Sequence, residues 1–400
     1  MSALPKIRVL DMTRVFAGPW AAQMLGDFGA EVVKIEQPGG GDDVRRMGFR
    51  KVGADGKPVG ETSSFLAMNR NKRSIALDIA KPEGAALLRA MAAKADVFIE
   101  NFKTGGLRKY GLDYASLAEV NAKLVYCSIT GFGQSGPYAA LPGYDPIFQA
   151  MSGLMSVTGV ADGEPGAGPT VVGYSVSDIN AGMYATVAIL AALHHRDTVS
   201  GKGQHIDLAL LDAQVAAHSH IAMNHLVSGR MPVRAGTASQ INTPWQAFST
   251  ADRPLMVAVG NDRQFSQLCQ VLGVPADPRF ATNPQRMAHR DVLLPLLQDA
   301  FLKRRAQEWM DALNAVGVSS GPINDFAAVA EDPQIRHRAM FSATPDGAPT
   351  IANPVRFSDT PVAYTRAPPT LGQHTAEVLG EWLGTDAAEA ARLAEAGIVA

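Results

Sequence analysis

Asp178 is a candidate nucleophile because of its position in the sequence. It stands near the start of Val176–Leu193, an apolar segment with the composition of a buried helix, in the motif YSVSDINAG. An acid at a helix start can simply satisfy free backbone N–H groups and complement the helix dipole, which is the commoner role. A partly buried carboxylate at the same place can instead attack an activated acyl group. Composition leaves both roles open.

Other candidate residues follow predicted strands at their carboxyl ends, where open α/β sheets bind ligands. The first crossover carries Ala17, Gly18 and Pro19 at the junction of a strand and a helix, where small residues let a ligand approach free backbone N–H groups. A close-packed turn without a ligand explains these residues equally well. The later strand ends carry basic residues that could meet phosphates, although solvated surface charge is their commoner fate. They are Arg70, Lys72, Arg73, Lys103 and Lys109.

Several other chemistries lack their sequence signatures. The nine histidines form neither HExxH nor a Cys/His cluster, so no metal site is predicted. GxSxG and the Walker phosphate loop are absent. The first crossover also lacks GxGxxG, which argues against a nicotinamide-dependent dehydrogenase. The run GGGDD (Gly39–Asp43) follows the second predicted strand without a helix behind it, and we interpret it as a flexible acidic loop.

Composition limits the class of protein and its partners. The chain has 400 residues, 46% of them hydrophobic, and a net charge of -2, which favours two domains and predicts no general attraction to nucleic acid or anionic membrane. Cys127 and Cys269 lie in separate apolar runs and are interpreted as core thiols. No signal-peptide pattern opens the chain, and the apolar helix candidate Ala181–Leu193 is too short to span a bilayer. We therefore expect a cytoplasmic protein.

The first half of the chain predicts parallel strands joined by crossover helices, because short β-branched runs alternate with segments of helical periodicity. This pattern predicts a doubly wound, Rossmann-like α/β sheet. The expected strands are Ile7–Met12, Glu31–Glu36, Arg73–Ile79, Asp96–Asn101 and Leu124–Thr130. The expected helical segments are Pro19–Phe28, Pro82–Lys94, Leu107–Glu119, Asp145–Met155, Val176–Leu193 and Leu208–Leu226.

A second, smaller α+β domain is predicted after a polar, turn-rich stretch around Ser228–Asn242. A short strand, Leu255–Gly260, precedes three helical segments at Arg263–Leu272, Arg290–Phe301 and Ala306–Val316. A final helix near Thr375–Leu383 belongs to a segment that returns to the large domain. The expected organisation is a large domain over residues 1–225, a linker and small domain over 226–330, and a returning segment over 331–400.

These blocks together resemble the class III CoA-transferase family, also called the CaiB/BaiF family. The resemblance covers nearly the whole chain, through VLDMTRVFAGPWAAQMLGDFGAEVVKIE, NRNKRSIALD, ENFKTGGL, SITGFGQSGPY, GYDPIFQAMSGLM, SDINAG, GKGQHIDLALLDA, VAVGNDRQF, ATNPQRMAHR and LGQHTAEVLGEWLG. It implies that Asp178 is the nucleophile, which forms an acyl anhydride and then an aspartyl-CoA thioester. Coenzyme A and acyl-CoA would be substrates, and no permanently bound cofactor is implied.

The resemblance also implies a set of CoA contacts at the first crossover and later strand ends. They are Val15, Phe16, Ala17, Gln37, Leu77, Asp78, Asn101, Phe102, Lys109 and Thr130. Phe16, Tyr144 and Gly260 would lie at the acyl group or its oxygen. Formyl-CoA transferase has basic residues at the positions of Gln37, Ala80, Lys109 and Thr130, so neighbours would help to hold the phosphates. These neighbours are Lys81, Lys103 and Arg108.

Two departures bear on the substrates. Formyl-CoA transferase has Gln at the position of Phe16 and a run of glycines where this chain reads VAVGNDRQF, so formyl transfer to oxalate is disfavoured. The racemase branch of the family reads GHD where this chain has Tyr144 in GYD, which places the chain on the transferase side. A racemase-like enzyme and a non-catalytic CoA-binding module remain the alternatives. The resemblance finally implies an interlocked homodimer acting on small carboxylic acids, in which the region near Gly260 covers the active site of one subunit.

Overall fold

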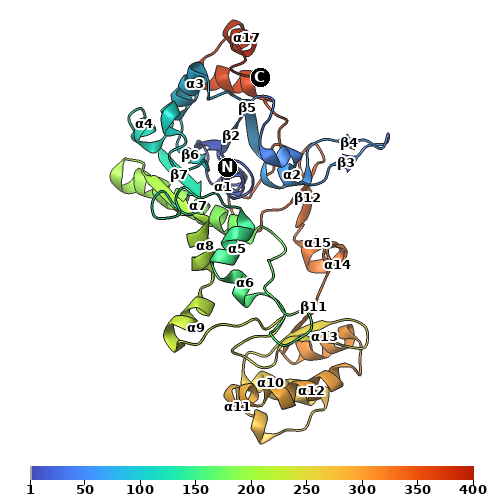
Figure 1. The fold of residues 1–400 in the computed structure, drawn as a ribbon. Helices are drawn as coiled ribbons and strands as arrows, with labels where there is room; N and C mark the ends of the chain where they lie inside the picture. The colour runs from blue at the N-terminus through green and yellow to red at the C-terminus, as the bar shows by residue number, and fades with distance from the viewer. Residues whose placement is uncertain (1) are drawn as a thin grey trace. The chain divides into compact units, whose positions relative to one another are not determined.

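The computed structural model describes residues 2–400 and divides into two compact units (Figure 1). The first unit comprises the residues up to Gly153 together with Val172–Ser219 and Gln334–Ala400. The second comprises Leu154–Val171 and His220–Pro333. The first unit holds the candidate residues at the strand ends and Asp178.

A six-stranded parallel sheet with the order β5-β2-β1-β6-β7-β8 forms the centre of the first unit. The chain runs outward from β1 in one direction and then, from β6 onward, in the other, so the crossovers diverge at the β1–β6 pair. The predicted doubly wound sheet is thereby confirmed. The strands are β1 (Arg8–Met12), β2 (Glu31–Glu36), β5 (Lys72–Ala76), β6 (Val97–Glu100), β7 (Val125–Thr130) and β8 (His205–Ala209).

Helices cover both faces of the sheet because successive strand residues alternate between two cores. Val9 belongs to a core with α1 (Ala17–Asp27) and α7 (Val176–His195), and Leu10 to one with α3 (Pro82–Ala92) and α16 (Thr375–Leu383). The other helices of this unit are α2 (Ser63–Met68), α4 (Tyr114–Ala118), α5 (Asp145–Met151), α8 (Leu210–Ala217), α15 (Pro333–His337) and α17 (Ala387–Glu395). Short antiparallel pairs join β3 (Lys51–Val52) to β4 (Pro58–Val59) and β12 (Phe341–Ala343) to β13 (Pro349–Ile351).

The returning C-terminal segment closes the open edge of β5. The N–H of Asp78 donates to the carbonyl of Ile398 at 2.8 Å, and the N–H of Ala400 donates to the carbonyl of Ala76 at 3.2 Å. The buried side chains of Val378 and Trp382 pack in the same core as Leu88. The edge of the sheet is therefore paired with chain from the far end of the sequence, which removes an exposed strand edge.

The second unit is built on a three-stranded antiparallel sheet with the order β11-β10-β9. Its core includes Phe248, Phe301 and Trp309, and Arg286 is buried among carbonyl groups of Thr243 and Phe280. The elements are α6 (Leu154–Val157), α9 (His220–Ser228), β9 (Trp245–Phe248), β10 (Leu255–Ala258), α10 (Asp262–Leu272), α11 (Asn283–Ala288), α12 (Arg290–Phe301), α13 (Ala306–Ala315), β11 (Ser319–Pro322) and α14 (Phe326–Glu331).

Three sequence-based expectations are corrected by the structure. The single helix predicted over Leu208–Leu226 is a strand end followed by α8 and α9. Val176–Ser200 is long and apolar enough to cross a membrane, whereas the expected run, Ala181–Leu193, was too short. Half of its most apolar stretch is buried, and Ala181 and Ile189 pack in the core. The run GGGDD is not a flexible loop, since Asp42 is 1% exposed and its N–H donates to Glu36. The two cysteines are free and buried, as predicted.

Candidate active site

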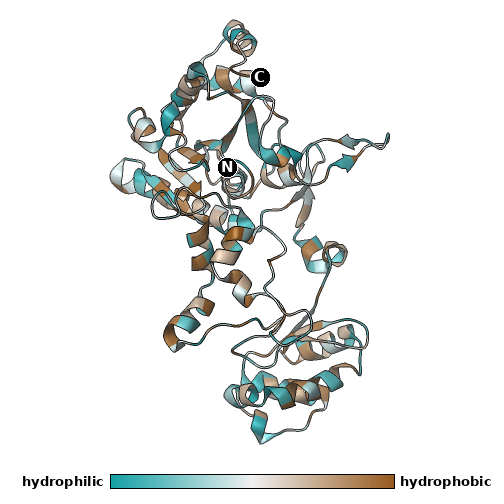
Figure 2. Ribbon diagram, viewed as in Figure 1, coloured by the Kyte–Doolittle hydropathy of each residue, from teal (hydrophilic) through white to brown (hydrophobic). Residues whose placement is uncertain are grey.

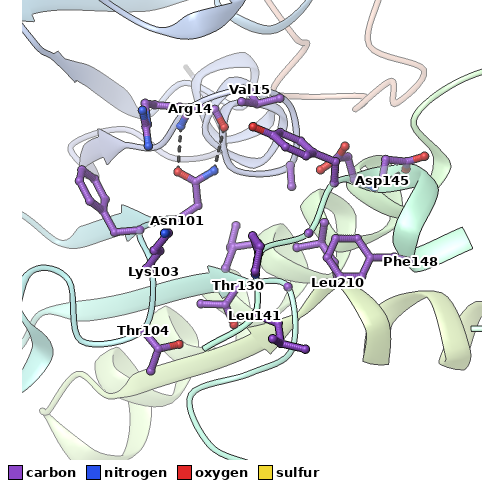
Figure 3. Close-up of a pocket in the computed structure, with 18 of the residues that line it drawn as sticks. Arg14, Val15, Asn101, Lys103, Thr104, Thr130, Leu141, Asp145, Phe148 and Leu210 are labelled. Atoms are coloured by element: carbon purple, nitrogen blue, oxygen red, sulfur yellow. Dashed lines mark hydrogen bonds between the residues drawn. The ribbon is translucent and has the colours of Figure 1, made fainter. Parts of the chain in front are cut away.

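The carboxyl ends of β1, β6 and β7 border a pocket of about 250 Å³ that is lined in part by Asp178. Figure 3 shows part of its lining, with Arg14 and Val15 from the loop after β1 and Asn101 from the loop after β6. The backbone N–H of Arg14 donates to Oδ1 of Asn101, whose Nδ2 donates back to the Arg14 carbonyl. Because the crossovers diverge at the β1–β6 pair, this is where a doubly wound sheet forms its ligand crevice.

Asp178 lies in the first turn of α7 with 9% of its surface exposed. Burial, and to a lesser extent the negative charge of nearby Asp145, raise the pKa of this carboxyl to about 7, although the hydrogen bond from the backbone of Ala17 acts in the opposite direction. The result is a carboxylate that exchanges its proton near neutral pH and is poorly solvated when charged. Such a group is more basic than an ordinary aspartate.

The N-terminus of α7 is capped by Asp145, which belongs to α5. Its Oδ2 accepts hydrogen bonds from the backbone N–H groups of Ser177 at 2.7 Å and Asp178 at 3.3 Å. Gln149 donates to the other oxygen of Asp145 at 2.5 Å and accepts from the N–H of Val172 at 2.8 Å. These N–H groups are therefore satisfied from another helix, and the capping role considered for Asp178 falls to Asp145.

A second pocket of about 200 Å³ lies on the other side of the loop after β1. Arg14 and Phe102 line both pockets. The second pocket combines apolar and aromatic side chains, including Ile79 and Tyr110, with the carboxylate of Asp78. This combination suits a flat heterocycle with hydroxyl groups beside it, because the ring stacks on apolar surface and the hydroxyls donate to an acid.

The two pockets gather most of the residues that the resemblance implied. Residues in the first pocket are Val15, Ala17, Asn101, Phe102, Thr130, Tyr144 and Asp178. Residues in the second are Gln37, Leu77, Asp78 and again Phe102.

The remaining implied residues lie outside these linings. Phe16 is partly buried between two pocket residues without lining either pocket, and the ammonium of Lys109 stands 4.7 Å from the Tyr110 ring. Gly260 belongs to the second unit, where its N–H donates to Gln264 at 2.8 Å. Of the expected phosphate-binding neighbours, only Lys103 lines the first pocket, and Lys81 donates to the carbonyl of Ala396.

Two residues of the site were missed in the sequence. Asp145 stands 33 positions before Asp178 and reaches it only through tertiary structure, although an acid beside Pro146 at a helix start is a visible signal of an N-terminal position. Arg14 follows the first strand in the same block as Val15, and its place between two pockets depends on the sheet topology. In residues 2–400, no group of three His, Cys, Asp or Glu side chains has an arrangement that could hold a metal ion.

Comparison with known proteins defines the class. The model of the family described as CoA-transferase family III matches residues 4–375 of this chain, so the chain belongs to that family. A succinate–glutarate CoA-transferase of Agrobacterium fabrum (strain C58 / ATCC 33970) is 47% identical over 94% of this chain and 95% of its own length. The human succinyl-CoA:glutarate CoA-transferase is 39% identical over 99% of this chain and 90% of its own.

A solved structure agrees with this assignment. A CAIB/BAIF family protein from Brucella suis is 42% identical and superposes with a TM-score of 0.84 over 95% of this chain and 99% of its own. The protein is therefore a CoA-transferase that acts on CoA thioesters.

Proposed function

We propose that Asp178 carries the acyl group and CoA in turn between a donor acyl-CoA and an acceptor carboxylate. The carboxylate of Asp178 attacks the thioester carbonyl, giving a mixed anhydride and CoA thiolate. The thiolate then attacks the aspartyl carbonyl of the anhydride, which releases the donor acid and leaves an aspartyl-CoA thioester. The acceptor carboxylate repeats both steps in reverse order, which yields the new acyl-CoA and restores Asp178. Each step exchanges leaving groups of similar reactivity.

The position and basicity of Asp178 carry this proposal. Its carboxylate borders a pocket at the ligand crevice, and burial raises its pKa to about 7. A carboxylate that has lost most of its water shell reacts more readily with an acyl carbon than a solvated one, yet near neutral pH about half of the molecules remain ionised. Because Asp145 already caps α7, a structural role explains these features less well.

The two pockets suggest how CoA lies across the loop after β1. We place the adenosine in the second pocket, where Asp78 can accept from ribose hydroxyls, and the thioester in the first pocket beside Asp178. Arg14 lines both pockets and would meet the diphosphate that joins the two halves of CoA. A guanidinium is suited to this contact because its donors match phosphate oxygens.

Small dicarboxylates are the proposed acyl groups. The names of the two similar enzymes given above specify succinate or succinyl-CoA together with glutarate. Of the two basic residues that line the first pocket, Arg14 is assigned to the diphosphate, which leaves Lys103 for the second carboxylate of the substrate. A panel of mono- and dicarboxylic acceptors tests this assignment, and equal use of both classes would contradict it.

A homodimer is proposed because the first unit exposes apolar side chains on neighbouring helices. Met183 and Val187 of α7 are 51% and 65% exposed, and Ile147 of α5 is 47% exposed. Figure 2 shows hydrophobic stretches along α5 and α8 as well. The family resemblance supports an interlocked pair, which would not dissociate on dilution; light scattering that finds a monomer at low micromolar concentration would contradict it.

With two free thiols, the enzyme fits the reducing cytoplasm.

Trapping of the covalent intermediate tests the mechanism. The enzyme is incubated with succinyl-CoA or glutaryl-CoA without an acceptor, treated with hydroxylamine, digested and examined by mass spectrometry. We expect a hydroxamate on the peptide that contains Asp178, and neither labelling nor transfer in Asp178→Asn. A racemase would instead exchange the α-proton with deuterated water and form no adduct. A CoA-binding module without activity would bind CoA and show neither result.

A further inference from the structure

The loop between β1 and α1 holds a backbone conformation that its side chain disfavours. Val15 has a φ of 71°, in the left-handed region. A β-branched residue is strained there, since its side chain crowds the backbone, and such strain persists only where surrounding contacts hold it. The contacts around residues 13–15 should therefore identify what this conformation is for.

Side chains bind the backbone of three successive residues in this loop. The carbonyl of Thr13 accepts from Lys34 at 2.9 Å. Arg14 exchanges two hydrogen bonds with Asn101, at 3.0 and 2.7 Å. The N–H of Val15 donates to Oδ1 of Asp42 at 3.0 Å. The contact with Asp42 acts directly on the strained residue.

Asp42 is itself fixed by buried charge. Its side chain is fully buried and forms an ion pair with Lys34 at 2.8 Å, next to a second fully buried pair between Lys72 and Asp11, also at 2.8 Å. Oδ1 of Asp42 accepts from the N–H of Val44 as well. Lys72 donates to the carbonyl of Pro19 in the first turn of α1, so the buried charges hold both ends of the loop.

The run GGGDD explains how Asp42 reaches this place. Gly39 and Gly41 have positive φ values of 75° and 64°, which glycine adopts without strain, so the chain turns back after β2 and carries Asp42 under the loop. The neighbouring Asp43 stays at the surface, where it pairs with Arg46 at 3.0 Å. Two adjacent acids of this run therefore have different roles.

The far end of the same loop meets the nucleophile. The backbone N–H of Ala17 acts on the carboxyl of Asp178, and the packing between them is tight, because a Cβ on Gly182 of α7 would lie 2.7 Å from the carbonyl oxygen of Ala17. We infer that Asp42 is a positioning residue for the transfer reaction: held by Lys34, it keeps Val15 in the left-handed conformation and so directs the N–H of Ala17 at Asp178. The inference rests on the proposed role of Asp178.

A double-mutant cycle tests this coupling. Asp42→Asn should lower kcat at least tenfold, because the residue at 42 no longer satisfies both Val15 and Lys34. Glycine adopts a positive φ freely, so in the Val15→Gly background the same change should lower kcat threefold or less. Equal losses in both backgrounds would overturn the inference, since Asp42 would then act independently of Val15.

The single variant Val15→Gly tests whether Val15 is strained, without any change at Asp42. Replacing an unstrained residue by glycine normally destabilises, whereas at a strained left-handed position the midpoint of thermal unfolding should stay level or rise. A clear fall would show that Val15 is not strained, and the inference would fail whether or not Asp42→Asn folds.

The pH profile of kcat/KM separates positioning from a structural role. Charged groups near Asp178 are Asp145 from α5 and the pocket residues Arg14, Asp43 and Lys103. Loss of the Ala17 contact in Asp42→Asn should move the acid limb to higher pH, whereas loss of the Asp42 charge alone would move it lower. The matched control Asp27→Asn removes another fully buried acid, paired with Arg70, and should lower stability with the limb unmoved. A limb that stays in place in Asp42→Asn would overturn the inference; trapping on Asp178 could still succeed, so the two proposals fail separately.

Discussion

Asp145 caps the helix that begins at Asp178, and the same contact brings two carboxylates together. Oδ2 of Asp145 accepts from the backbone N–H of Asp178 at 3.3 Å. The negative charge of Asp145 has two effects, because it stabilises the N-terminus of α7 and raises the pKa of Asp178 beside it. Stability and reactivity are therefore linked through one hydrogen-bonded acid.

Asp178→Asn should stabilise the protein at alkaline pH. The pKa of about 7 in the folded protein lies above the ordinary aspartate value of 3.8, so the contribution of Asp178 to stability is fully present below about pH 4 and is lost as the pH rises through 7. The variant lacks this loss, and its advantage in unfolding free energy should grow to a few kcal/mol at pH 8. Thermal unfolding from pH 4 to 8 measures it.

Asp197→Asn is the control for that experiment. Its hydrogen bond with Arg196 lowers the pKa of Asp197, which reverses the sign, so this variant should lose a little stability at neutral pH and none in strong acid. A constant difference between Asp178→Asn and the wild type at every pH would contradict the raised pKa.

Asp145→Asn should shift the acid limb of kcat/KM to lower pH by roughly one unit, because the charge that raises the pKa of Asp178 is gone. An asparagine keeps an acceptor for the N–H of Ser177 but turns its NH₂ group toward Gln149. We therefore expect a loss of about 1–2 kcal/mol in stability. A limb that moves to higher pH would show that Asp145 acts on Asp178 in some other way.

Gly182→Ala should lower both stability and kcat. The added Cβ would lie 2.7 Å from the Ala17 carbonyl and 2.9 Å from Cδ1 of Trp20, so α7 must move away from the loop. Overpacking of this kind costs about 1–3 kcal/mol, more than the gain from alanine in a helix. Gly173→Ala is the matched control, because the Cβ that it adds meets open space. Unchanged stability and kcat in Gly182→Ala would show that α7 and the loop at Ala17 are not in close contact.

Arg14→Gln should raise KM for acyl-CoA about tenfold with little change in kcat, since the lost contact with the diphosphate is the same in the ground and transition states. The KM of the wild type should also rise with salt more steeply than that of the variant. Arg108→Gln is the control, because Arg108 is exposed and lines neither pocket of the site. An unchanged KM in Arg14→Gln would show that Arg14 does not bind the diphosphate.

Local periodicity predicted much of the secondary structure, with α12 and α16 found at the expected bounds. The prediction failed at β8, where exposed and partly buried residues alternate in a strand at the edge of the sheet and the apolar residues after it also fit a helix. The placement of Asp145 and Asp42 could not be predicted, because each acts across more than twenty residues on a backbone N–H group that only the tertiary structure brings near. The strain at Val15 could not be predicted either, because nothing in the composition indicates that a valine adopts a positive φ.

Vectorial synthesis gives the pairing of Asp78 with Ile398 a further meaning. A nascent chain that extends through β1, β2, β5 and β6 to Tyr110 has all the side chains that line the second pocket, but it lacks the C-terminal segment that pairs with Leu77 and Asp78. That segment emerges more than 300 residues later, so the pocket stays incomplete until residues 398 and 399 have been made. A ribosome-bound chain stalled before residue 398 should therefore bind CoA weakly.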